Sequence, residues 1–97
     1  MPYYRVLLSG RNFLLEGEDG RRRMGFYTSR FVQAATPVDA EDEAVKVLSN
    51  EGKLKALNDR SDPPEVFVEE ILEVEKADVP AAVEGFAFFP DDREPDA

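Results

Sequence analysis

The chain has 97 residues, of which 21 are acidic and 12 basic, so its formal net charge is −9, and it contains no cysteine, histidine or tryptophan. Without cysteine there is no disulfide, thiolate metal site or cysteine nucleophile, and without histidine the commonest general base and transition-metal ligand are missing. These absences exclude the usual catalytic triads and the usual zinc and haem sites, and we predict a non-enzymatic protein without a cofactor or a bound metal.

Strand-forming residues dominate the first part of the chain. Residues 3–8 and 12–16 predict two strands, because both are rich in apolar and aromatic side chains. Ser9-Gly10-Arg11 is interpreted as a turn between them. The sequence Gly-Glu-Asp-Gly at 17–20 predicts a hairpin turn, since aspartate and glycine tolerate left-handed backbone geometry.

Residues 21–35 predict a third strand that is longer than strands usually are. We therefore expect a bend or a bulge in it, at Gly25 or near Ser29. Its apolar residues fall on both parities, so this strand should present apolar side chains to both faces of a sheet.

A helix is predicted to begin after Thr36. Threonine can cap a helix, proline suits the first helical position, and Asp39 at the third position interacts favourably with the helix dipole. Four residues at three- and four-residue spacing predict its buried face: Ala40, Ala44, Val47 and Leu48.

The second half of the chain predicts one more strand and a short apolar segment. Pro63-Pro64 ends a polar loop, and residues 65–75 then alternate as a strand does. Residues 85–90 are apolar, and residues 91–97 predict an acidic, disordered tail. The expected order is strand–strand–strand–helix–strand followed by a short C-terminal apolar strand or segment. This order predicts an α+β two-layer sandwich, a single domain over 1–90 in which one main helix covers one face of an antiparallel sheet.

No targeting segment is visible, and no run approaches the ~20 apolar residues that a membrane span requires. We therefore expect a cytoplasmic protein that does not associate with membranes.

An apolar surface is the leading candidate site. One helix covers only one face of a sheet, and apolar residues on the other parity are expected on the second face, at Tyr27, Phe31, Phe67 and Ile71. Either Phe86, Phe88 and Phe89 fold back over this face, or a second copy, another protein or a ligand covers it. Since large exposed apolar patches usually mark interfaces, we predict a protein-interaction module that forms a homodimer or binds a protein partner.

Arginines suggest an alternative function. Arg21, Arg22, Arg23 and Arg30 alternate with aromatic residues, a pattern that could bind single-stranded nucleic acid as a regulator does. The charge argues against this alternative, because phosphate affinity depends mainly on cationic charge. Residues 1–33 carry six arginines against three acids, a net charge of +3, whereas residues 34–97 carry six basic and eighteen acidic residues, a net charge of −12. We favour pairing of these arginines with the acidic second half.

Glutamates on the strand at 65–75 form the last candidate. Glu69, Glu73 and Glu75 could bind a hard cation or act as an acid/base pair. No calcium-loop pattern surrounds them, so we favour a solvated face that protects against edge-to-edge aggregation. Glu70, which shares the parity of the apolar valines, is expected either to sit at a bend or to pair with an arginine of the long strand, since an unpaired buried charge is costly.

Overall fold

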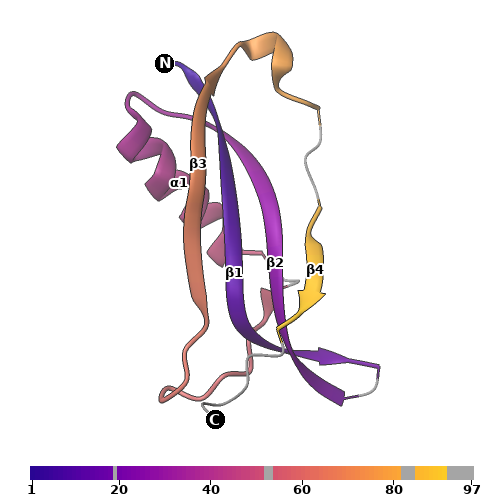
Figure 1. The fold of residues 1–97 in the computed structure, drawn as a ribbon. Helices are drawn as coiled ribbons and strands as arrows, with labels where there is room; N and C mark the ends of the chain where they lie inside the picture. The colour runs from indigo at the N-terminus through magenta and orange to yellow at the C-terminus, as the bar shows by residue number, and fades with distance from the viewer. Residues whose placement is uncertain (19, 52–53, 82–84, 92–97) are drawn as a thin grey trace.

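The computed structural model describes residues 1–18, 20–51, 54–81 and 85–91. Its elements, drawn in Figure 1, are the strands β1 (Tyr3–Gly17) and β2 (Gly20–Gln33), the helix α1 (Pro37–Ser49), the strand β3 (Glu65–Val74), the short 3₁₀ helix η2 (Lys76–Asp78) and the strand β4 (Ala87–Pro90). The four strands form one antiparallel sheet in the order β3-β1-β2-β4, and α1 packs on one face of it. The predicted α+β two-layer sandwich is confirmed.

The first two predicted strands are one continuous strand. The turn expected at Ser9-Gly10-Arg11 is wrong, because β1 stays paired with β2 on both sides of it. Between Gly10 and Phe13 the register shifts by one residue, and Asn12 has a left-handed φ of 60°. This bulge lies opposite Gly25, and the hairpin bends sharply in its lower part in Figure 1.

Asn12 holds the bulge in place through every polar group that it has. Its N–H donates to Asp91 Oδ2 (2.7 Å), and its Nδ2 donates to Asp62 Oδ1 (2.8 Å). Its carbonyl accepts from Asn58 Nδ2 (2.7 Å), and its Oδ1 accepts from Arg23. Since asparagine tolerates the left-handed region better than most residues, the side chain both permits the bulge and ties two distant loops to it.

The helix begins as predicted. Thr36 is its N-cap, and the Asp39 N–H donates to Thr36 Oγ1 at 3.1 Å. Ala40, Ala44 and Leu48 are buried against the sheet, whereas Val47, which the spacing grouped with them, is 45% exposed. Alanines on the buried face let the helix approach the sheet closely.

The hydrophobic core lies between α1 and the sheet. Opposed residues of an antiparallel pair point to the same face, so the side chains opposite Tyr4, Val6 and Leu8 on β2 and β3 share the face that α1 covers. Phe26 is fully buried there and meets the rings of Phe13, Phe86 and Phe88 edge-on. We call this the covered face, and the other side of the sheet the open face.

The C-terminal apolar segment extends the sheet and does not fold over it. β4 pairs with β2 at its edge, from Met24↔Pro90 to Tyr27↔Ala87. Phe86 and Phe88 contact Phe26 on the covered face, and only Phe89 reaches the open face. The open face is therefore left largely uncovered by residues 85–91.

The first residue of the predicted tail is part of the folded structure. Asp91, assigned to the tail, is buried, and its N–H donates to the Arg23 carbonyl at 3.0 Å. The rest of the predicted tail, residues 92–97, and Asp19 of the predicted hairpin turn lie outside the described residues.

Candidate interface on the open sheet face

The open face is assembled by the pairing of three long strands. On β1 and β2 it receives the pairs Tyr3↔Gln33, Arg5↔Phe31, Leu7↔Ser29, Ser9↔Tyr27 and Arg11↔Gly25. On β3 the residues opposite the same five positions of β1 are Val74, Leu72, Glu70, Phe67 and Glu65. The sheet therefore presents a grid of five rows, to which β4 adds Ala87 and Phe89 in the two lowest.

Two aromatic residues of the predicted interface lie on this face with large exposed fractions. Tyr27 is 44% exposed and Phe67 is 43% exposed. Phe31 lies on β2 two rows above Tyr27 and is partly buried. Phe67 lies on β3, Tyr27 and Phe31 lie on β2, and β1 runs between these two strands. Among the described residues no ring contact joins any two of the three, and Tyr27 instead contacts Phe89.

Ile71, the fourth predicted residue, lies on the opposite face. Glu69 is an extra residue in β3, because Leu7 opposes Glu70 while Leu8 opposes Val68. A one-residue bulge reverses the alternation beyond it. Ile71 therefore packs against the core, and Leu72, 46% exposed, takes its place on the open face. In the sequence, the break in alternation at Glu70, a charged residue at the parity of the apolar valines, is the signal next to this bulge.

Two polar contacts on the open face are made within the chain, whereas Arg5 Nε is buried without a hydrogen-bond partner among the described residues. Arg5 Nη2 lies 3.2 Å from Glu70 Oε1, so Glu70 pairs with β1 and not with the long strand that the sequence suggested. The hydroxyl of Ser9 donates to Glu69 Oε2 at 2.6 Å. Both contacts join β1 to the edge strand β3. The first pairs the charges of Arg5 and Glu70, and the second gives the Glu69 carboxylate a hydrogen-bond donor.

Arg11 is held at the lower end of the same face. Its guanidinium lies 5.0 Å from the ring centroid of Phe89 and 3.9 Å from Asp91 Oδ1. The Phe89 ring in turn lies 5.6 Å from Tyr27 and covers Gly25, where a Cβ would lie 2.5 Å from it. This end is thus a packed aromatic cluster with its cation neutralised.

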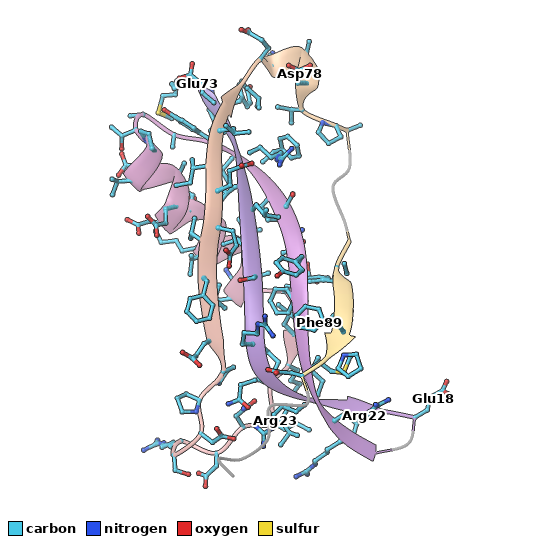
Figure 2. All side chains as sticks on the ribbon, viewed as in Figure 1. Glu18, Arg22, Arg23, Glu73, Asp78 and Phe89 are labelled. Carbon is cyan, nitrogen blue, oxygen red and sulfur yellow. The ribbon has the colours of Figure 1, made fainter. Side chains whose placement is uncertain are left out.

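Folding divides the predicted basic edge, because Arg30 is buried while Arg21, Arg22 and Arg23 stay together near the hairpin tip. Arg30 is only 6% exposed: its Nη1 donates to Thr28 Oγ1 at 2.6 Å, and its guanidinium lies over Phe86 on the covered face. Arg23 Nη1 donates hydrogen bonds to Asn12 Oδ1 and Asp62 Oδ2, and Arg21 Nε lies 3.7 Å from Glu16 Oε2. Arg22 is exposed near the hairpin tip, close to Glu18, as Figure 2 shows.

Folding pairs the two oppositely charged parts of the sequence. Of the six arginines before residue 34, four form ion pairs with acids of the second part, and these pairs are Arg5–Glu70, Arg11–Asp91, Arg23–Asp62 and Arg30–Glu51. The remaining acids include Glu73 and Asp78, at the opposite end of the molecule from the hairpin tip in Figure 2. Among the described residues no group of three or more acids is placed to hold a metal ion, and no helix is long and apolar enough to span a membrane.

The structure also contains an apolar hollow of about 270 Å³ on the covered side, lined among others by Phe13, Leu48 and Val66. Its lining is mostly apolar, with Ser49 as the polar side chain among the residues that line it.

The fold and the site define a two-layer α+β domain with an apolar open sheet face. No family model matches the chain, and no curated protein or solved structure is significantly similar to it.

Proposed function

We propose that the protein is a non-enzymatic self-association module whose open sheet face is the contact surface. The observation that carries this proposal is the exposure of Tyr27, Phe67 and Leu72 on one sheet face that neither α1 nor residues 85–91 cover. Apolar patches of this kind on monomers usually mark interfaces.

The size of the face fits a reversible dimer. Three strands about 30 Å long and about 4.8 Å apart, with the short β4 beside them, present roughly 500 Å². Two copies packed face to face would bury on the order of 1,000 Å², which is the size of small, transient interfaces. The charges on the face are compatible with the same occupant, since Arg5 and Arg11 each have an acidic partner within the copy, Glu70 and Asp91.

Sedimentation velocity at micromolar concentration tests this function. We expect a concentration-dependent dimer that Phe31→Glu shifts to monomer, because it places a charge on the apolar face. Val47→Glu is the matched control, since Val47 is exposed on α1, on the other side of the molecule, and this variant should leave the dimer intact. A strictly monomeric protein that Phe31→Glu does not change would refute the proposal.

A further inference from the structure

Four apolar residues of the open face are arranged symmetrically about its middle row. This row consists of Glu70, Leu7 and Ser29 on β3, β1 and β2. The row above it carries Leu72 and Phe31 on the flanking strands, and the row below carries Phe67 and Tyr27 on the same two strands. An in-plane two-fold rotation about the middle row therefore exchanges these four apolar positions with one another, while at the end of β3 it places Val74 over Glu65.

From this pattern we propose, on the basis of the self-association above, that two copies pack face to face about a two-fold axis that crosses the strands over Leu7. An interface between identical copies that are related by a two-fold axis must be self-complementary. Each strand then lies over its own counterpart in the partner, running in the opposite direction. Leu7 meets the partner's Leu7, Phe31 meets the partner's Tyr27, and Leu72 meets the partner's Phe67.

Polar side chains fit the same arrangement. The rotation places Arg5 over the partner's Ser9, whose hydroxyl is bonded to Glu69, so each arginine faces a carboxylate across the interface. It also brings the two Glu70 side chains together, and each of these has its own Arg5 at 3.2 Å. At the ends of the grid Tyr3 lies over the partner's Arg11, a pair that can form a cation–π contact.

The other two-fold axis, parallel to the strands, fits poorly. Placed over β1, it would lay β3 of one copy over β2 of the other, so that Leu72 meets the partner's Phe31 and Phe67 meets the partner's Tyr27. It would also bring the two Arg5 side chains together, whereas the axis over Leu7 places each Arg5 near a carboxylate of the partner. The strand directions of two packed sheets lie within about 30° of each other. With the axis over Leu7, residues one row from the centre therefore still meet their counterparts in the partner.

Charge complementation between two variants tests this arrangement. Phe31→Lys and Tyr27→Glu should each weaken the dimer at least about tenfold, as substitutions at central aromatic contacts do. Mixed in equal amounts, they should form a heterodimer, because Lys at 31 of one copy then faces Glu at 27 of the other. Native mass spectrometry separates this heterodimer from both homodimers by mass. Circular dichroism should show that each variant remains folded, since neither residue lies on the covered face.

Phe31→Lys mixed with Phe67→Glu is the matched control. It carries the same two charges, but these positions lie on different strands and do not meet about the proposed axis, so no heterodimer should accumulate. A wild-type dimer in which the control mixture complements equally, or in which neither mixture complements, overturns the two-fold arrangement and leaves self-association standing. A monomeric wild-type protein overturns both.

Discussion

The covered and open faces of the sheet are built from the same strands but differ in what completes them. On the covered face, aliphatic β1 side chains and Phe26 are sealed by Ala40, Ala44 and Leu48 of the helix. On the open face, Tyr27, Phe67 and Leu72 keep more than two fifths of their surface exposed. When a sheet carries apolar side chains on both faces, a single helix can bury those of only one face within a single copy. Substitutions on the two faces should therefore separate stability from association.

The largest effect is expected at Phe26, which is fully buried and contacts three other rings. Phe26→Ala should lower the free energy of unfolding by about 3–5 kcal/mol, because it leaves a cavity at the centre of the core. Phe31→Ala, on the open face of the same strand, should cost less than about half of that. Urea denaturation of both variants, at a protein concentration low enough to favour the monomer, measures the difference. Equal losses would mean that the open face is as important to the fold as the core.

The bulge at Glu69 gives a sharper comparison between two neighbouring residues. Ile71→Lys should destabilise the protein by about 1–3 kcal/mol, because Ile71 packs against the core. Leu72→Lys should change stability by no more than about 0.5 kcal/mol, while it weakens self-association. Denaturation and sedimentation on the same two proteins test this. The reverse assignment of the two effects would show that β3 has no bulge and that Ile71 lies on the open face.

Alanine substitutions at two glycines compare the stability cost of one added methyl group on each face. A Cβ at Gly10 would overlap the buried ring of Phe26, whereas a Cβ at Gly25 would meet Phe89 on β4, at the edge of the sheet. Gly10→Ala should cost about 1–3 kcal/mol as an overpacked core does. Gly25→Ala should cost less, since Phe89 can shift outward. Thermal unfolding gives the order of the two midpoints, and a lower midpoint for Gly25→Ala would contradict this reading.

Salt has the smallest expected effect. Each copy carries a net charge of −9, and Arg5 and Arg11 on the open face each lie next to an acid of their own copy. Raising the sodium chloride concentration should therefore tighten the dimer modestly, because it screens repulsion between the two acidic molecules. A dimer that dissociates in salt would instead depend on attraction between opposite charges of the two copies. Sedimentation equilibrium over a range of salt concentrations decides between these outcomes.

Local signals in the sequence predicted much of this fold. The run Thr36-Pro37 with Asp39 placed the helix start, and the alternation of Phe26, Tyr27 and Phe31 assigned each to its observed face. Both signals act within a few residues, so a single sequence is enough to interpret them.

The features that escaped prediction depend on distant partners. A glycine at position 10 is compatible with a turn and equally with a strand position that an aromatic ring covers. In the structure the ring of Phe26 lies against Gly10, and the strand continues through it. The bulge at Glu69 follows from pairing with β1, and the off-parity Glu70 marks its neighbourhood without fixing the register. For this reason the sequence placed Tyr27, Phe31 and Phe67 on the sheet face where they lie and Ile71 on the wrong one.

The bond between the Asn12 N–H and Asp91 has a consequence for the order of folding. These residues are 79 positions apart, so closing this contact requires nearly the whole described chain to be present. Long-range contacts carry a loop-closure entropy that local ones do not. The hairpin and helix can therefore form early, while the bulge at Asn12 gains its final partner only after β4 has docked. During synthesis, which proceeds from the N-terminus, both apolar faces of the hairpin would emerge before the segment that completes the covered one.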